Sequence, residues 1–349
     1  MCLFSSCCAN ADELIDETDC GECSQQCEFI EEVAHFCSEE RDAEERDTEE
    51  TDTSYVFFSL NCQLLRGVCK GQGGPPAYLN VRAACLANRL ASIAEFIDAI
   101  ALQECFDRES TALLIRKLTT YFPHVTEGKS KSGCVILSKL APKHSVFHGF
   151  ATSSGGERIF FNKGVLGVAL SDPDKDTTVC VFNTHFQSDF WRKSRDTRQA
   201  QAQEMKTFVE KSMRSKRFLG SSKVDAAVVC GDLNCDAGSA EYEKIMEILG
   251  GNTSTFRDTL PVGDEESLQT FPECTYSLKK KRYVVKENTK KKRLDYIFEI
   301  SGELNVGEIG ETKRRRKTKA RVVRTLRDDN NVPLSDHRGI IVAIERVYI

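Results

Sequence analysis

The pattern of apolar and polar positions changes abruptly near residue 55. Residues 38–53 contain one alanine among charged and hydroxyl side chains, too little apolar surface to offset the chain entropy lost on folding. From Tyr55 the chain reads Tyr-Val-Phe-Phe-Ser-Leu-Asn-Cys, a run of aromatic and β-branched residues typical of a buried strand. The pattern predicts an acidic, Cys-rich, disordered tail over residues 1–54 and a folded domain over residues 55–349.

Helical and strand-like segments are interspersed within this domain. Leu86, Leu90 and Ile93 recur at the spacing of an amphipathic helix, and similar patterns predict helices at residues 111–121, 195–212 and 239–249. Short apolar runs predict strands at residues 99–103, 134–138, 158–161, 165–171, 177–183, 226–230, 294–300 and 339–347. This mixture predicts an α/β protein with two packed sheets, although periodicity does not give the strand order.

The sequence predicts an intracellular, cytoplasmic protein. No apolar run approaches the ~18 residues of a membrane span, and the first residues lack the basic and apolar regions of a secretory signal. Cys2, Cys7 and Cys8 beside Leu3 and Phe4 are candidates for S-acylation, which would anchor the chain peripherally to a membrane. The later N-terminal cysteines could instead bind zinc or form a surface cluster of free thiols.

Charge is divided unevenly along the chain. The net charge is -5, yet residues 1–54 hold 18 acidic residues against two arginines, which leaves the remaining residues net basic. Basic stretches at residues 279–293 and 313–324 could dock on an anionic membrane, bind nucleic-acid phosphates, direct nuclear import or simply form solvated loops. The acidic tail could fold over this basic surface and compete with a membrane.

Polar residues gather where the predicted strands end. Each of them alone has an ordinary explanation, as a turn residue or a hydrogen-bonded core group. Together they form an oxygen-rich set that suits Mg²⁺ and phosphate chemistry. A histidine paired with a carboxylate can take a proton from water, and a carboxamide can donate to a phosphoryl oxygen. The set consists of Asn61, Glu104, His185, Asp232, Asn234, Asp295, Asp336 and His337.

These residues predict metal-assisted hydrolysis of a phosphate ester. The chain contains no Gly-x-Ser-x-Gly elbow and no Gly-x-x-x-x-Gly-Lys phosphate loop, which removes two competing chemistries.

The order of the motifs resembles one family. The motifs are Phe161-Asn162-Lys163-Gly164, Asn183-Thr184-His185, the glutamine-rich segment 198–204, Gly231-Asp232-Leu233-Asn234 and Pro333-Leu334-Ser335-Asp336-His337. With them the chain resembles the endonuclease/exonuclease/phosphatase superfamily, and within it the neutral sphingomyelinases. The resemblance implies a four-layered α/β sandwich of two mixed sheets flanked by helices. It also implies Mg²⁺-dependent hydrolysis, with Mn²⁺ as a possible substitute, of sphingomyelin or a related phospholipid to ceramide and phosphocholine at a membrane surface.

The resemblance also implies roles for the metal and for water. Glu104 would bind the catalytic Mg²⁺, with Asn61 nearby and Asp336 close to the metal. Asp232 would position or activate the attacking water. Whether Asp232 or His337 deprotonates that water stays open.

The same resemblance assigns the substrate contacts. His337 would be the general base, oriented by Asp295. Asn234 and His185 would hold the phosphoryl oxygens. Lys163 matches the Lys-Gly motif of the family and would approach the phosphate, although a solvated lysine is the ordinary alternative.

Two departures and three alternatives qualify this assignment. The hydrophobic segments of some animal relatives are missing, and Phe186-Gln187 follows His185 where an aliphatic residue is usual. A DNA- or RNA-directed nuclease of the same superfamily remains the alternative function. An inositol phosphatase is disfavoured because Leu294-Asp295-Tyr296 occupies the place of its Pro-Ala-Trp-Cys-Asp-Arg segment. An inactive binding protein is disfavoured because all eight polar positions are chemically competent.

Overall fold

The fold is taken from a computed structural model of the full chain. The structure describes residues 24–41, 54–65, 76–174, 176–189, 193–220, 222–250, 255–260, 262, 268–272, 274–277, 282–285, 290–300, 317–329 and 331–346. In the described part of the chain, no helix combines the length and apolarity needed to cross a bilayer.

The first of two six-stranded sheets is mixed. Its central pair, β1 and β2, is parallel, and every other neighbouring pair is antiparallel. Its order is β13 (Thr318–Val322), β14 (Ile340–Glu345), β1 (Ser54–Leu64), β2 (Ala99–Cys105), β4 (Val135–Ser138) and β3 (His124–Glu127).

The second sheet repeats this plan. Its central pair, β7 and β8, is parallel, and the flanking pairs are antiparallel. Its order is β5 (Ala141–Gly149), β6 (Gly164–Asp172), β7 (Thr177–His185), β8 (Lys223–Asp232), β12 (Asp295–Ile300) and β9 (Phe256–Asp258). A separate hairpin pairs β10 (Cys274–Ser277) with β11 (Arg282–Val285).

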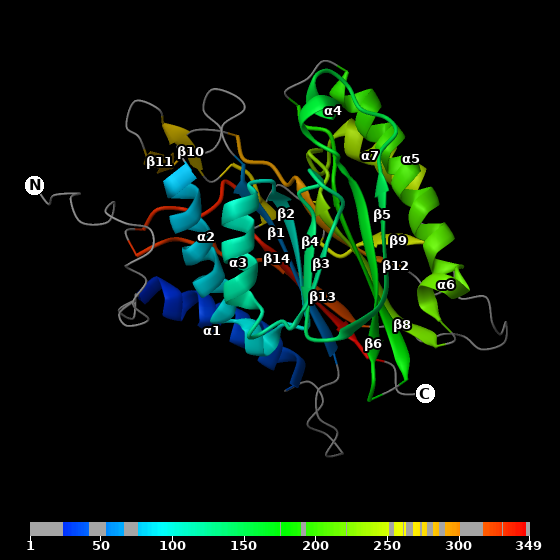
Figure 1. The fold of residues 1–349 in the computed structure, drawn as a ribbon, viewed down its shortest axis with the longest axis horizontal. Helices are drawn as coiled ribbons and strands as arrows, with labels where there is room; N and C mark the ends of the chain where they lie inside the picture. Colours follow the sequence, from blue (N-terminus) through cyan, green and yellow to red (C-terminus); the bar gives the residue numbers. More distant parts are fainter. Residues whose placement is uncertain are drawn as a thin grey trace, which may run out of the picture.

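Helices cover the outer face of each sheet, so the molecule has four layers (Figure 1). The first sheet is covered by α1 (Ser24–Arg41), α2 (Pro76–Ala91) and α3 (Arg108–Leu118), with the short η1 (Ala94–Phe96) following α2. The second is covered by α5 (Ser194–Met213), α6 (Lys216–Leu219) and α7 (Ala240–Leu249). The predicted four-layered α/β sandwich of two mixed sheets is therefore confirmed.

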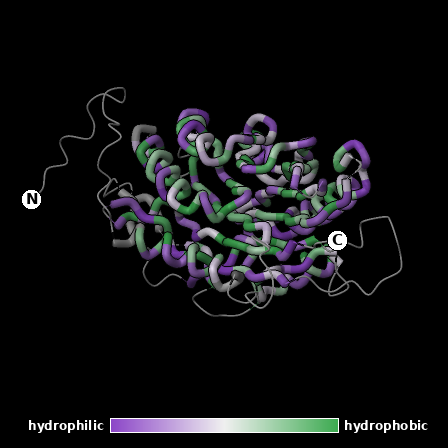
Figure 2. Tube along the Cα trace, turned by 90° about the horizontal axis from the view of Figure 1, so that it is seen from below, coloured by the Kyte–Doolittle hydropathy of each residue, from purple (hydrophilic) through white to green (hydrophobic). Residues whose placement is uncertain are grey.

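Three apolar cores separate the layers, because successive side chains of a strand point to opposite faces. On β1, Tyr55 and Phe57 enter the core between the sheets, whereas Phe58 and Leu60 enter the core beneath the helices. Both faces of the central strands are buried, which explains their nearly continuous apolar sequences. Figure 2 shows hydrophobic segments concentrated inside the molecule and hydrophilic segments toward its outside.

One strand prediction is wrong. Residues 158–161 do not form a strand; α4 (Glu157–Phe160) is a single helical turn whose end is closed by the Phe161 N–H donating to the Glu157 carbonyl at 2.8 Å. Ile159 and Phe160 are exposed, so their apolar character did not report burial in a sheet. Lys163, three residues after this turn, lies beside His185.

The expectation of a disordered tail is wrong for Ser24–Arg41. These residues form α1, and Phe29, Val33 and Phe36 are buried in the core on the first sheet. The Arg324 guanidinium pairs with Glu28, and the Arg324 N–H donates to Glu32 at 3.1 Å. The acidic segment therefore does contact part of the basic segment 313–324, as a packed helix. The N-terminal cysteines up to Cys23, residues 42–53 and parts of both basic stretches, namely residues 279–281, 286–289 and 313–316, lie outside the described residues.

Candidate functional site

The two parallel strand pairs end at the same edge of the sandwich, and the polar residues lie along that edge. His185, Asp232 and Asp295 are direct neighbours in register across β7, β8 and β12. Gly231 lets β7 and β8 approach at this point, because a Cβ there would lie 2.0 Å from the Thr184 carbonyl oxygen. In the facing sheet, Asn61 is in register with Gln103, beside Glu104.

Unusual backbone conformations occur at this edge. Gln63, Glu104 and Asn234 have φ values of 50°, 56° and 51°, a region that non-glycine residues rarely adopt and that is often found at functional sites. Arg82, which is buried, donates from Nη2 to the carbonyl oxygens of Cys62 at 2.8 Å and Gln63 at 2.7 Å. Helix α2 thereby fixes the irregular end of β1.

His337 and Asp295 form a buried pair. Asp295 Oδ2 lies 2.8 Å from His337 Nδ1, and the Thr270 hydroxyl accepts from the Asp295 N–H at 3.3 Å. On its other side, His337 Nε2 lies 3.8 Å from both Asp232 Oδ2 and Asp336 Oδ1. One imidazole nitrogen is therefore anchored, while the other faces two carboxylates beyond hydrogen-bond distance.

Asp232 occupies the centre of the arrangement. Its Oδ1 accepts from the Asn234 N–H at 2.7 Å, and its Oδ2 accepts from Asn61 Nδ2 at 3.0 Å. Its side chain is only 2% exposed. Because Asn61 and Asp232 come from different sheets, this hydrogen bond joins the two halves of the sandwich at the site.

His185 lies between this carboxylate and a lysine. His185 Nε2 is 3.7 Å from both Glu104 Oε1 and Asp232 Oδ2. Lys163 Nζ lies 3.0 Å from the same nitrogen and also donates to the Phe186 carbonyl at 2.8 Å and to Glu157 Oε1 at 2.5 Å. The three ammonium protons of Lys163 thus have partners within the protein.

Burial and nearby negative charges raise the pKa values of the carboxyl groups at this site. Burial and then the nearby Asp295 raise the pKa of Asp232 to about 6. Burial, with a contribution from Glu104, raises the pKa of Asp336 to about 6 although His337 opposes the shift. Burial also raises the pKa of Glu104, against the opposing effects of Lys163 and His337. The negative charges of these carboxylates repel one another, and a bound cation would reduce that repulsion.

The pKa values of the two histidines are shifted in opposite directions. Burial, with the positive charge of Lys163, lowers the pKa of His185 well below its ordinary value. For His337 burial also acts to lower the pKa, but the carboxylates of Asp295 and Asp336 outweigh it and raise the pKa well above its ordinary value. Such a separation is typical of groups that exchange protons in catalysis.

The side chains at this edge fit a divalent metal ion. One ligand atom from each of Glu104, His185 and Asp232 lies within 4.8 Å of the others, and a second such group is Asp232, Asp295 and His337. Asp336 Oδ1 is buried and has no hydrogen-bond partner. Carboxylate oxygens with unused acceptor capacity suit a hard cation. The structure thus brings all eight polar positions of the predicted set, together with Lys163, to one edge.

Other residues of this edge were not predicted from the sequence. Gln63 donates from Nε2 to Asp336 Oδ2 at 2.7 Å, and Glu157 pairs with Lys163. Gln63 follows Asn61 by two positions on the same strand, a spacing that could have identified it. Glu157 offered no signal, because it lies just before residues 158–161, which were predicted to form a strand.

Comparison with known proteins matches most of the chain to one family. Residues 58–337 match the endonuclease/exonuclease/phosphatase family. An uncharacterized protein of Dictyostelium discoideum is 28% identical over 202 residues, 52% of this chain and 18% of the relative. Sphingomyelinase C of Leptospira interrogans is 25% identical over 181 residues, 46% of this chain and 31% of the relative. The matched regions thus span less than a third of either relative.

Solved structures share the fold. A variant of beta toxin from Staphylococcus aureus with bound magnesium ions has a TM-score of 0.60 at 20% identity, covering 84% of this chain and 100% of that one. D. rerio TDP2 complexed with a single-strand DNA product has a TM-score of 0.56 at 17% identity, with coverage of 84% and 100%. The chain belongs to the endonuclease/exonuclease/phosphatase family, as a member that resembles the sphingomyelinases.

Proposed function

We propose that the protein is a Mg²⁺-dependent phosphodiesterase that hydrolyses sphingomyelin to ceramide and phosphocholine. The observation that carries the proposal is the anchored His337, whose free nitrogen faces Asp232 and Asp336 beside Glu104. This is an arrangement in which water can be deprotonated next to a cation-binding edge. The sphingomyelinases among the relatives support the choice of lipid.

Three residues are proposed to hold the metal, as the sequence resemblance implies. Glu104 would be the principal ligand, with Asn61 and Asp336 nearby. Asp336 Oδ1 has unused acceptor capacity, and Glu104 lies close enough to raise the pKa of Asp336. When bound, Mg²⁺ would supply positive charge that stabilises the phosphoryl oxygens in the transition state.

His337 is proposed as the general base. In the neutral form of His337, with its Nδ1 proton directed at Asp295, Nε2 is the nitrogen that would accept a proton from water. Asp232, 3.8 Å from that nitrogen, would orient the water, since each of its oxygens accepts one hydrogen bond, from Asn234 or Asn61, and keeps a further lone pair. Asp295 would stabilise the imidazolium that forms.

Asn234 and His185 are proposed to position the phosphoryl oxygens. Asn234 Nδ2 lies 3.1 Å from His185 Nε2 and can turn its amide to a phosphoryl oxygen beside Asp232. Lys163 is better suited to orienting His185 than to the direct phosphate contact expected from the sequence, because all its protons have partners.

Two substrates are tested in one experiment. Phosphocholine release from sphingomyelin vesicles is measured with and without Mg²⁺, beside nicking of plasmid DNA. The DNA arm is included because a TDP2 structure with a DNA product shares the fold. Release that requires Mg²⁺ supports the proposal. Nicking without lipid turnover would move the function to nucleic acid.

Matched variants assign the activity to this site. We expect Glu104→Gln and His337→Ala to abolish release. Glu243→Gln on the exposed face of α7, and His124→Ala at the opposite end of the first sheet, should release phosphocholine at the wild-type rate. Full activity in Glu104→Gln would contradict the proposed metal ligand.

A further inference from the structure

Two neighbouring apolar side chains on α4 are exposed to solvent. Ile159 is 72% exposed and Phe160 is 47% exposed. The other exposed large apolar residues of the described chain are single positions, namely Val81, Tyr121 and Val262. Isolated apolar residues are ordinary on a surface, whereas an adjacent pair beside a functional edge indicates a contact with an apolar phase or partner.

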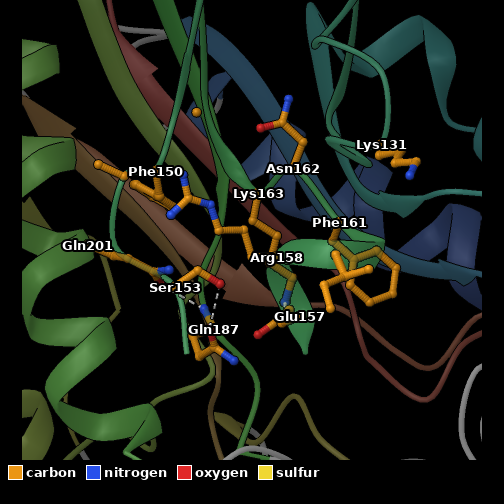
Figure 3. A pocket seen from close by; sticks show the side chains of 13 residues that line it. Lys131, Phe150, Ser153, Glu157, Arg158, Phe161, Asn162, Lys163, Gln187 and Gln201 are labelled. Carbon is orange, nitrogen blue, oxygen red and sulfur yellow. Dashed lines mark hydrogen bonds and ion pairs between the residues drawn. The ribbon is translucent and has the colours of Figure 1, made fainter. Parts of the chain in front are cut away.

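A cationic pocket of about 410 Å³ lies against the same turn (Figure 3). Among its lining residues are Lys131, Glu157, Arg158 and Lys163. Lys163 and Glu157 neutralise each other, since their charged atoms lie 2.5 Å apart. Arg158 and Lys131 form no ion pair with another described residue, so the pocket keeps two uncompensated positive charges. Figure 3 shows Lys131 on the side opposite Gln201.

The turn is attached firmly to the candidate site. The Phe161 ring packs 4.4 Å from the Phe106 ring, which in turn lies 6.3 Å from the His185 ring. Lys163, two residues further, contacts both Glu157 and His185. The Asn162 N–H donates to the Lys131 carbonyl at 2.8 Å, which fixes the loop carrying Lys131 against the turn. Anything bound at α4 is therefore held at a constant position relative to the site.

We infer that α4 and its pocket form the surface that docks the protein on a membrane containing anionic phospholipid. Ile159 and Phe160 enter the boundary between headgroups and acyl chains, and Arg158 and Lys131 bind the phosphate or carboxylate of a neighbouring anionic headgroup. The inference rests on the proposed function, because it explains how a chain without a described membrane-crossing helix would reach a lipid substrate.

Charge and shape favour an anionic lipid over the other occupants. A trimethylammonium group would meet two uncompensated cations in the pocket, which opposes its binding. A single nucleic-acid strand binds through stacking on aromatic faces, and Ile159, the more exposed residue of the pair, has no such face. A bilayer satisfies the apolar side chains and the cations together.

The test measures vesicle binding in EDTA, where no turnover occurs, so its outcome does not depend on the proposed hydrolysis. Full-length protein is sedimented with phosphatidylcholine vesicles that contain or lack phosphatidylserine. Each cation near an anionic leaflet changes partitioning about fivefold. We expect Lys131→Gln with Arg158→Gln to weaken binding to phosphatidylserine vesicles about 30-fold. We expect Ile159→Ser with Phe160→Ser to weaken binding to both vesicle types.

Two matched controls occupy the opposite end of the sandwich. Lys139→Gln follows β4, whose last residues pair with the first residues of β2, and Tyr121→Ser follows α3, which runs away from Glu104. Both should bind vesicles like the wild type. The inference is overturned if wild-type protein ignores phosphatidylserine, if the α4 variants bind normally, or if the controls lose as much binding. It is also overturned if the α4 variants lose single-stranded DNA binding while their vesicle binding is unchanged.

Discussion

At the scale of single residues, the two nitrogens of His337 have different environments. Nδ1 is anchored by Asp295, and Nε2 faces the carboxylates of Asp232 and Asp336. A neutral amide in place of Asp295 would keep the shape but would no longer stabilise the imidazolium formed when water is deprotonated.

We therefore expect Asp295→Asn to lower kcat by a factor of about 10² to 10⁴. KM should change little, because Asp295 does not face the substrate in the proposed mechanism. Steady-state kinetics on sphingomyelin would show this, with thermal unfolding as the check that the fold is kept. A kcat within twofold of the wild type would remove His337 from the role of general base.

A second prediction concerns pH and metal binding. Without a cation, Asp232 and Asp336 take up protons below a pH of about 6, since their pKa values are raised to that point. A raised carboxyl pKa destabilises the charged folded form above pH 6, and a bound cation relieves this cost by pairing with the carboxylates. Lowering the pH replaces the cation with protons.

We expect Mg²⁺ to raise Tm clearly at about pH 7.5 and weakly at about pH 5. At a concentration about 100 times its Kd, a ligand stabilises the folded state by about 2.7 kcal/mol. Differential scanning fluorimetry with and without Mg²⁺ checks this. Glu104→Gln should respond weakly at both pH values. An equal response of the wild type at both values would show that these carboxyl groups do not control metal binding.

The sequence was most informative about the individual residues of the candidate site. Strand ends and motif order identified the residues that the structure brings to one edge, because the end of a strand fixes its side chain in space. Glu157 was not predicted, since its contact with Lys163 depends on the single helical turn of α4, where the sequence indicated a strand. An ion pair of this kind produces no periodic pattern in the sequence from which it could be predicted.

At the scale of elements, α1 is the main difference between expectation and structure. Phe29, Val33 and Phe36 form an apolar stripe at helical spacing, but the many acidic residues around them hid it in composition. The prediction for residues 158–161 was wrong for the opposite reason: apolar residues suggested a buried strand, but those of α4 are exposed to solvent. Both errors arise because local composition does not report which face another element will cover.

The buried stripe makes α1 part of the folded domain, which gives a third prediction. Phe29→Ala should lower the free energy of unfolding by about 3 kcal/mol, the cost typical of a truncated core phenylalanine. Glu31→Ala, at an exposed position of the same helix, should have almost no effect. Urea unfolding of both variants provides the comparison. If Phe29→Ala unfolds at the wild-type midpoint, α1 does not contribute to the stability of the domain.

At the scale of the whole molecule, the site exists only where the two sheets meet. Periodicity could predict that there would be two sheets, but not the pairing order that places Asn61 of one sheet against Asp232 of the other. A second polar link lies between the sheets. Asn183 on β7 donates from Nδ2 to the carbonyl oxygens of Leu102 at 2.8 Å and Val135 at 2.9 Å, and it accepts from Gln103 at 2.8 Å.

This buried amide connects the packing of the sheets to the catalytic edge, since Gln103 precedes Glu104. Asn183→Leu keeps the approximate volume but leaves the Gln103 amide and two carbonyl groups without that partner, which costs about 1 to 3 kcal/mol for an unsatisfied buried group. We expect a lower unfolding free energy together with a lower kcat and a weaker Tm response to Mg²⁺. Gln203→Leu, which removes an exposed amide on α5, should change none of the three. A variant that loses stability but keeps kcat and its response to Mg²⁺ would mean that the site tolerates movement between the sheets. Joint loss would instead show that the polar link between the sheets holds Glu104 in register with Asp232.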